Sequence, residues 1–421
     1  MASEEFQPLQ GMSDLSSPEI SIWQRIESTT RRVFHLYGCD EVRTPVLEKS
    51  TVFERTMGDT TDVVQKEMYV FEDRGGRRVA LRPEGTAGVM RYIAGLGQEG
   101  HDARVYYIGP MFRCERPQAG RKRQFHQLGA ELIGPANAAA DAEAIAMQVQ
   151  LLHELGARDF KVQLNTRGLS EDREAVVKGL RALLEPRRAE LGEDDQRRLD
   201  QNILRVLDTK DEKSLPLVKS LPPMTEFMAE SSRDYLQEVV SHLKRLEIDV
   251  VLNPRLVRGL DYYMHTVWEI THPALGSQDA LAGGGRYKIT IGDRAVEGVG
   301  FAMGMERLVT ALQKDLGDAA AAPKLALIWV VSLGPAAFQE NFRLVQTLRM
   351  RGVRCGLDLA GRSMKAQMRA ADRAGATAVI IRGDTEMEKG VFVFKDMATG
   401  TQTELTMPEL LERLQSVNLV A

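Results

Sequence analysis

The feature that most restricts the fold of this chain is a pair of long strand candidates on either side of a short polar loop. The two segments are residues 104–114 and 124–133, and the loop is residues 115–123. Apolar and aromatic residues recur along both segments, as in half-buried strands. They predict a long antiparallel hairpin over residues 104–134 in a β-rich domain. Shorter strand candidates lie at residues 42–46, 68–72, 79–82, 161–165, 250–252 and 266–271.

Helical spacing and a stretch of small residues divide the chain into two predicted domains. The first, residues 1–323, has a helix at about 16–37, with a serine cap and a stop at Gly38, and a second at 138–155. Residues of about 170–249 are rich in Arg, Lys, Glu and Leu at helical spacing, which indicates a helical insertion. After a small-residue linker, strand and helix patterns alternate. This alternation predicts a compact α/β domain over residues 324–421.

Composition and cysteine usage exclude several classes of protein. The chain has 421 residues, a net charge of −4 and three widely spaced cysteines, Cys39, Cys114 and Cys355. An acidic chain does not favour a protein that coats nucleic acid, although local basic patches can still bind RNA. No apolar run reaches the roughly 18 residues of a membrane span, and the first residues do not resemble a signal peptide. We therefore expect a cytoplasmic protein with no membrane partner.

The loop of the hairpin carries the strongest chemical signal. Residues 113–123 include five basic side chains, and arginine suits a two-pronged grip on phosphate. On the return strand, Gln127 and Glu131 point to one face together with Phe125 and Gly129. We expect this face to bind a polar ligand, with Gly129 leaving room for it. The alternative is an exposed basic turn on an ordinary hairpin.

Further segments give this interpretation a specific form. Four of them resemble class II aminoacyl-tRNA synthetases in general: motif 1 at 36–45, the amino-acid loop LRPEGT at 81–86, motif 2 FRCERP at 112–117 and motif 3 GFAMGMERL at 300–308. The peptides LVRGLDYY (256–263) and AGGGRY (282–287) are similar to the two signature peptides of the histidyl-tRNA synthetase family. Residues 361–368 resemble the anticodon-binding module of that family.

The resemblance implies a fold and a reaction. The fold would be an α+β catalytic domain with a six- to seven-stranded, mainly antiparallel sheet, a helical insertion, and a C-terminal α/β anticodon-binding domain. The enzyme would activate L-histidine with ATP to histidyl-adenylate and transfer it to the 3′ end of histidine tRNA. Mg²⁺ would arrive with ATP. No metal site of the protein's own is predicted, because His126, His265 and His272 show no metal-ligand spacing. Motif 1 implies a homodimer.

The same resemblance implies roles for individual residues. The expected catalytic residues are Arg113, Arg258 and Arg307. ATP would bind through Arg113, Glu115, Arg121, Phe125 and Arg307, with Glu115 at the adenine amino group and Phe125 stacked on the base. Histidine would bind through Glu84, Thr86, Arg113, Gln127, Glu131, Arg258, Tyr262, Tyr263 and Tyr287. The tRNA would bind through Arg116, Arg121, Arg123, Lys365, Arg369 and Arg373.

Structural alternatives and two departures accompany this interpretation. Arg258 could form a salt bridge, each tyrosine could be a core aromatic, and the helix face of the last three basic residues could be merely solvated. Lys288 stands where the second signature peptide usually has aspartate, and residues 289–298 form a shorter segment than is usual. The main rival is a synthetase-like regulatory subunit of ATP phosphoribosyltransferase, which would bind histidine without charging tRNA. A prolyl or threonyl synthetase would lack the two histidine peptides.

Overall fold

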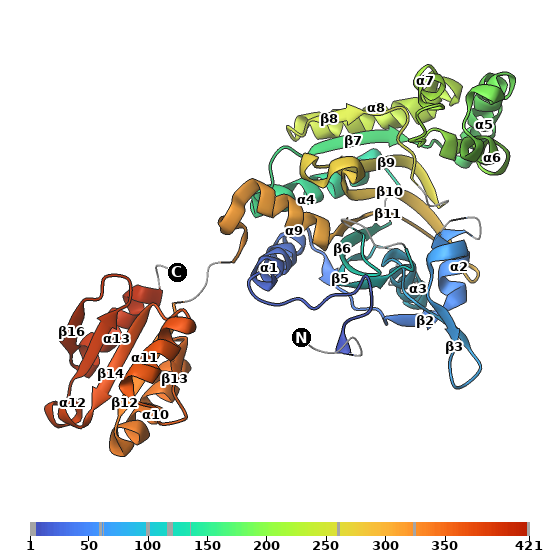
Figure 1. The fold of residues 1–421 in the computed structure, drawn as a ribbon. Coiled ribbons are helices and arrows are strands. Elements are labelled where there is room, and N and C mark those ends of the chain that lie inside the picture. The colour runs from blue at the N-terminus through green and yellow to red at the C-terminus, as the bar shows by residue number, and fades with distance from the viewer. Residues whose placement is uncertain are drawn as a thin grey trace. The chain divides into compact units, whose positions relative to one another are not determined.

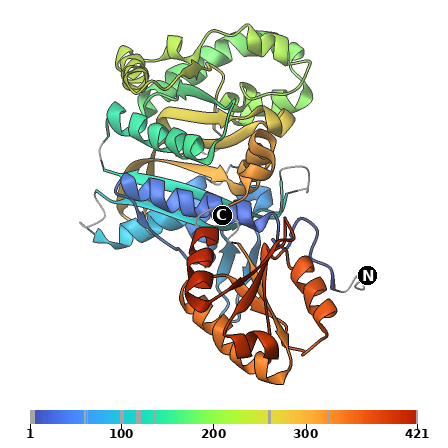
Figure 2. The same ribbon diagram turned by 90° about the vertical axis from the view of Figure 1, so that its left-hand side faces the viewer.

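The structure is a computed structural model that describes residues 6–58, 61, 63–97, 102–115, 121–134, 136–258, 262–322 and 326–418. The chain forms two compact units, Met1–Ala322 and Pro323–Ala421. The first is built on a large sheet and the second on a smaller one (Figure 1, Figure 2). None of the helices in the described ranges has the length and apolar character that crossing a membrane requires.

The large sheet has eight strands within the described residues, in the order β1, β5, β6, β11, β10, β9, β7, β8. Neighbours from β5 to β7 are antiparallel, and the two edge pairs are parallel. The expected mainly antiparallel sheet is confirmed, and short edge strands make it wider than six or seven strands. The bounds are β1 (Asp40–Glu41), β5 (Arg104–Phe112), β6 (Gln124–Ile133), β11 (Arg294–Gly304), β10 (Ala280–Ile291), β9 (Tyr263–Thr271), β7 (Lys161–Thr166) and β8 (Val250–Leu252).

Long helices cover one face of this sheet and share a core with it. They are α1 (Ile20–Leu36), α4 (Ala138–Leu155), α8 (Glu230–Arg245) and α9 (Met305–Leu316). Strand residues such as Leu128, Trp268 and Phe301 complete the core. The predicted serine cap of α1 is wrong, because residues 17–19 form a turn and the helix begins at Ile20 with no side-chain cap. Gly38, with a φ of 70°, follows its last turn as expected.

The opposite face carries α2 (Ser50–Met57), α3 (Thr86–Gly95) and a small sheet of β2 (Leu47–Lys49), β4 (Arg78–Leu81) and β3 (Val70–Glu72). The β3–β4 pair is antiparallel, as expected for a hairpin that turns at Gly75 and Gly76. The predicted strand at residues 42–46 is wrong. The Val42 N–H donates to the Tyr106 carbonyl oxygen of β5 at 2.8 Å, and the Thr44 and Val46 carbonyl oxygens accept hydrogen bonds from Arg82. Residues 42–46 therefore link β1 to β2 without forming a strand of their own.

Helices occupy most of the chain between β7 and β8. The first of them, α5 (Ser170–Leu184), α6 (Glu193–Gln201) and α7 (Leu215–Lys219), enclose a core of their own. The last, α8, belongs instead to the core of the large sheet. Asp172 joins the two parts, because its carboxylate accepts hydrogen bonds from the Ala229 N–H (2.7 Å) and the Ser232 hydroxyl (2.6 Å).

The second unit is an α/β fold, as its alternating pattern predicted. Its sheet has the order β13 (Cys355–Leu357), β12 (Ile328–Leu333), β14 (Ala378–Gly383), β15 (Phe392–Asp396) and β16 (Gln402–Leu405). The β13–β12–β14 part is parallel and the rest antiparallel. The helices are α10 (Pro335–Met350), α11 (Met364–Arg373), α12 (Asp384–Lys389) and α13 (Met407–Asn418). Sequence patterns did not indicate α12, β16 or α13, because β16 is mostly exposed and α12 is a short polar helix.

Candidate active site

The β5–β6 hairpin provides part of the floor of the candidate site. Gln127, Gly129 and Glu131 point away from the helix-covered face, since the alternate residues Leu128 and Ala130 lie in the helix-side core. The space over Gly129 is filled by Tyr107 of the paired strand, where a Cβ on Gly129 would lie 2.5 Å from the Tyr107 hydroxyl oxygen. The expectation that Gly129 leaves room for a ligand is therefore wrong, because it leaves room for this tyrosine.

Glu131 is the buried acid of the candidate site. Its carboxylate accepts hydrogen bonds from the Thr86 hydroxyl (2.7 Å) and the Tyr287 hydroxyl (2.8 Å), and the residue is 1% exposed. Burial raises the pKa of Glu131 to about 8, against these two hydrogen bonds, which lower it. A hydrogen-bond donor or a cation brought by a ligand would favour the charged form of this carboxyl group.

Three tyrosines lie beside one another in the same site. The ring centre of Tyr262 lies 4.7 Å from that of Tyr263 and 5.9 Å from that of Tyr287. Burial raises the pKa of all three hydroxyls above the ordinary value, so they remain protonated and can donate. The structure thus brings together Thr86, Glu131 and the three tyrosines from α3, β6, β9, β10 and the residue before β9.

Glu84 and Gln127 are the other acceptors expected to bind the amino acid. Glu84 is buried, and its carboxylate accepts the backbone N–H groups of Thr86 and Ala87, both at 2.7 Å, at the start of α3. Burial raises the pKa of Glu84. The side-chain oxygen of Gln127 is buried and has no hydrogen-bond partner among the described residues. Such an acceptor suits a ligand ammonium group.

Arginines from motifs 2 and 3 lie close together. Arg113 donates through Nε to the Pro83 carbonyl oxygen (3.0 Å), and its guanidinium lies 5.3 Å from the Phe125 ring centre. Arg121 binds the Glu115 carboxylate at 2.9 Å. Burial lowers the pKa of Arg307, and the nearby charges of Arg121 and Arg113 lower it further. Clustered guanidinium groups of this kind attract a polyanion such as a nucleoside triphosphate.

In this structure, protein groups occupy two of the expected adenine contacts. Glu115 pairs with Arg121, and the Phe125 ring is faced by Arg113. The role of Glu115 at the adenine therefore requires its contact with Arg121 to loosen or to be shared when ATP binds. An adenine stacked on Phe125 would take the ring face opposite Arg113 or displace that guanidinium.

Arg258 reaches the site from the first histidine peptide. Its NH1 donates to Oε2 of Glu269 at 2.9 Å, and its Nε is buried with no partner among the described residues. Burial raises the pKa of Glu269, against the charge of Arg258, which lowers it. The salt bridge is thus real, and the unpaired Nε leaves Arg258 with a donor for a ligand as well.

The three glycines of the second peptide lie in strand β10 rather than in a turn. A Cβ on Gly283 would lie 2.4 Å from Cζ of Arg258, and one on Gly285 would lie 2.6 Å from the ring of Tyr263. Gly284 lies under Trp268 on the helix-covered face in the same way. Each glycine is therefore required by a large side chain that crosses the strand.

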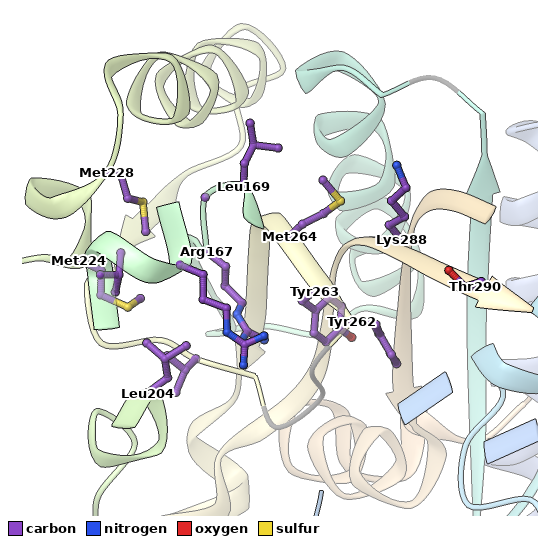
Figure 3. A pocket seen from close by; sticks show the side chains of 14 residues that line it. Arg167, Leu169, Leu204, Met224, Met228, Tyr262, Tyr263, Met264, Lys288 and Thr290 are labelled. Carbon is purple, nitrogen blue, oxygen red and sulfur yellow. The ribbon is translucent and has the colours of Figure 1, made fainter. Parts of the chain in front are cut away.

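A cavity of about 250 Å³ adjoins the tyrosines on the side of the helical insertion (Figure 3). Met224, Met228 and Leu204 of the insertion lie across it from Tyr262, Tyr263 and Met264, and the Arg167 side chain lies between the two groups. Lys288 lines it on the side of strand β10. Its wall combines apolar side chains with the cations Arg167, Arg173 and Lys288.

Lys288, the departure from the family pattern, lies on strand β10. Its Nζ is 3.5 Å from a carboxylate oxygen of Glu297 on the paired strand β11, and its side chain is 56% exposed. The segment 289–298 is short because strands β10 and β11 stay paired up to Ile291 and Arg294. Only the two-residue turn Gly292-Asp293 joins them. The lysine thus has a cross-strand partner of opposite charge.

The residues expected to bind tRNA fall into two groups. In the first unit, Nε of Arg123 donates to the Glu115 carbonyl oxygen at 3.3 Å, and Arg116 lies outside the described residues. In the second unit, Lys365, Arg369 and Arg373 are exposed on helix α11. These three cations form no ion pair with a carboxylate within the described residues.

Three further contacts, two polar and one aromatic, involve the histidines outside the site residues named above. Glu306 of α9 accepts the His126 N–H at 3.0 Å, which joins motif 3 to strand β6. His272 lies 3.1 Å from Asp315, and the His265 ring stacks on Tyr235 with 4.2 Å between centres.

Sequence patterns did not identify Tyr107 or Glu269 as site residues. Glu269 is a lone carboxylate in an apolar strand, and no motif marks it. Tyr107 could have been found from the hairpin register, because it lies opposite Gly129, and a glycine that faces an aromatic across a strand pair signals a ring crossing the backbone.

Comparison with known proteins defines the class first. The family model of histidyl-tRNA synthetase matches residues 11–308, and that of the anticodon binding domain matches residues 328–417. A synthetase unit followed by an anticodon-binding unit is the arrangement of an aminoacyl-tRNA synthetase. Within that class, the chain belongs to the histidyl-tRNA synthetase family.

Individual relatives match over nearly their full length. A histidine–tRNA ligase of Synechococcus elongatus is 44% identical over 99% of this chain and 98% of its own. One from Halothermothrix orenii is 42% identical over 97% of this chain and 98% of its own. The crystal structure of apo S. aureus histidyl-tRNA synthetase has a TM-score of 0.78 and 31% identity, and it covers 97% of this chain and 99% of that chain.

Proposed function

We propose that this chain is a ligase that activates L-histidine with ATP and transfers the histidyl group to histidine tRNA. One observation carries the proposal. A buried acid, Glu131, lies among tyrosine and threonine hydroxyls beside a cluster of arginines. The group around Glu131 suits an imidazole, and the arginine cluster suits a nucleoside triphosphate.

The pocket around Glu131 offers what recognition of an imidazole needs. A neutral imidazole presents one N–H donor and one acceptor nitrogen. Glu131 would accept the N–H, and a hydroxyl of Tyr262, Tyr263 or Tyr287 would donate to the other nitrogen. The free acceptor of Gln127, together with Thr86 and Glu84, would hold the α-ammonium group. Buried partners of this kind reject an analogue that lacks the matching groups by about 10⁴–10⁵.

In the first step the histidine carboxylate oxygen bonds to the α-phosphorus, and the bond from that phosphorus to the bridging oxygen of pyrophosphate breaks. Arg113 and Arg258 would hold the α-phosphate from two sides, and Arg121 and Arg307 the outer phosphates. In the second step a terminal hydroxyl of the tRNA attacks the carbonyl carbon, and AMP leaves. The arginines act by neutralising charge, and each such donor typically contributes about 10²–10³ in rate.

Magnesium would arrive bound to the phosphates of ATP. The carboxylates that act on Arg307 are Glu269 and Glu115, and each is already paired with an arginine. The phosphate oxygens would therefore supply most of its ligands, and the ion would neutralise charge on the leaving pyrophosphate.

The expected homodimer, tRNA contacts and location are parts of the same proposal. Two copies would associate through the end of α1 and residues 40–49, where Leu36 is 65% exposed and Leu47 is 41% exposed. The basic loop of the hairpin would meet the acceptor end of the tRNA, and Lys365, Arg369 and Arg373 its anticodon. Residues 1–323 would form the catalytic domain and 324–421 the anticodon-binding domain of a cytoplasmic enzyme.

The regulatory alternative predicts a different pattern of residues. A histidine-binding regulatory subunit would have no need of the phosphate arginines or of an anticodon unit. This chain has Arg113, Arg258 and Arg307, and an anticodon-binding unit over residues 328–417.

ATP–pyrophosphate exchange with each amino acid in turn tests the proposal. We expect exchange with histidine alone. Exchange with proline or threonine would assign another specificity, and histidine binding without any exchange would favour the regulatory alternative.

A further inference from the structure

Arg82 is a buried cation whose described hydrogen bonds all go to neutral oxygen atoms. It is 7% exposed, and its guanidinium donates to the Pro110 carbonyl oxygen (2.8 Å), the Thr44 carbonyl oxygen (3.0 Å) and the Thr44 hydroxyl (3.2 Å). Within the described residues it forms no ion pair with a carboxylate. Burial lowers its pKa. The charges of Glu48 and Glu84 raise this pKa, but neither carboxylate pairs directly with Arg82. Burying an arginine without a direct ion pair costs free energy, so its presence calls for a compensating role.

The backbone of Arg82 joins the same segments as its side chain. Its N–H donates to the Val46 carbonyl oxygen at 3.0 Å, and its carbonyl oxygen accepts the Phe112 N–H at 2.9 Å. The residue thus connects the crossing segment 42–46 to the end of strand β5. An arginine is suited to this position because its planar fork can bind two chain segments at once.

The residues that follow Arg82, and the strand end that its carbonyl oxygen binds, adjoin the candidate active site. The next carbonyl oxygen, of Pro83, accepts Nε of Arg113 at 3.0 Å. Phe112, held by the Arg82 carbonyl, immediately precedes Arg113. Glu84 follows and accepts two backbone N–H groups of α3. A shift of Arg82 would therefore move both anchors of Arg113 together.

Strand β5 is built to admit this side chain. A Cβ on Gly109 would lie 2.5 Å from NH2 of Arg82, so only glycine lets the guanidinium pass over the strand to reach Pro110 and Thr44. This close approach at Gly109 is a second, independent sign that the position of Arg82 is specified.

We infer that Arg82 is a positioning residue, which sets the place of the phosphate-binding Arg113 by joining segment 42–46, the loop 83–86 and strand β5. The inference rests on the proposed function. Because segment 42–46 lies in the region through which we propose dimer contact, Arg82 would also link that region to the α-phosphate site. A displacement of about 1 Å at a reacting centre can cost about 10² in rate.

The test compares Arg82→Gln, Arg82→Lys and the control Arg91→Gln by histidine-dependent ATP–pyrophosphate exchange and thermal unfolding. Arg91 lies on helix α3 and binds Glu48 of the neighbouring strand β2, but it contacts none of the site residues named above. We expect Arg82→Gln to lower kcat about 10²-fold. A smaller rise in KM for histidine should accompany it, because loop 83–86 also carries Glu84 and Thr86 of the histidine site. Arg82→Lys should fall between it and the wild type, and Arg91→Gln should keep its kcat.

The inference is overturned if Arg82→Gln keeps kcat within about threefold, or if the loss appears only as a higher KM for histidine. A wild-type protein with no exchange at all would instead contradict the proposed function. If Arg82→Gln does not fold, Thr44→Val decides the question, because it removes only the hydroxyl acceptor. It should lower kcat by several-fold while leaving KM for histidine unchanged, and an unchanged kcat would overturn the inference.

Discussion

Replacing Gly283 by alanine should displace Arg258 without disturbing the fold. The new Cβ would lie 2.4 Å from Cζ and NH1 of Arg258 and 2.5 Å from NH2. These atoms are the far end of a flexible side chain, so the guanidinium can move while strand β10 stays in place. Gly283 has no positive φ, and its backbone accepts alanine.

The size of the effect follows from this geometry. Ordinary contact begins at 3.4 Å, so the guanidinium must move by about 1 Å, the difference between 3.4 and 2.4 Å. A misplacement of about 1 Å at a reacting centre can cost about 10² in rate, or about 2.7 kcal/mol of activation free energy. We therefore expect Gly283→Ala to lower histidine-dependent exchange about 10²-fold with little change in the temperature of unfolding.

The matched control is Gly95→Ala, at the end of helix α3, where a Cβ would meet nothing within 4 Å. The exchange rate of this variant should equal that of the wild type. Arg258→Ala should lose about 10²–10³ in rate, and adding Gly283→Ala to it should cost nothing more, because the new methyl group no longer has a guanidinium to displace. An exchange rate within threefold of wild type for Gly283→Ala, or two losses that add in the double variant, would refute this account of Arg258.

Two further predictions concern pH and tRNA. The pKa of Glu131, about 8 when folded, lies above its ordinary value of 4.5, so the folded state binds the extra proton and stability falls as pH rises between these values. Glu131→Gln lacks this penalty, so its unfolding temperature should rise relative to wild type by the equivalent of about 1 kcal/mol per pH unit from pH 5 to 8, and a pH-independent difference would contradict the assignment. Replacing Lys365, Arg369 and Arg373 by alanine should raise KM for tRNA and reduce the salt dependence of tRNA binding by a slope of about 2–3, while exchange without tRNA stays unchanged. An unaltered salt slope would show that these side chains do not meet RNA.

Local sequence signals located the regular elements well. Helix α4 has its predicted bounds, Ala138–Leu155, because Asn137 caps its start by accepting the Ala140 N–H at 2.9 Å and Gly156 ends it with a φ of 82°. The long hairpin strands were also found, since apolar and aromatic residues recur along both strands, and every residue of the two strands is buried or half-buried.

Contacts between distant segments could not be read from the sequence in the same way. Nothing local shows that the Arg82 side chain binds the Thr44 carbonyl oxygen, and only the register of the hairpin places Tyr107 over Gly129. Helix α8 has the same composition and helical spacing as the rest of the insertion, yet it packs in the core of the large sheet through Leu236 and Val239. In each of these places, packing between distant segments overrides the local sequence pattern.

The proposed enzyme both activates histidine and transfers it to tRNA. Incubation with labelled histidine, ATP, magnesium and unfractionated tRNA measures this directly as histidine esterified to RNA. We predict that the label reaches a plateau set by the histidine-accepting tRNA, and that Arg258→Ala lowers the initial rate at least 10²-fold. Histidine binding in calorimetry with no label transferred to RNA would contradict the claim.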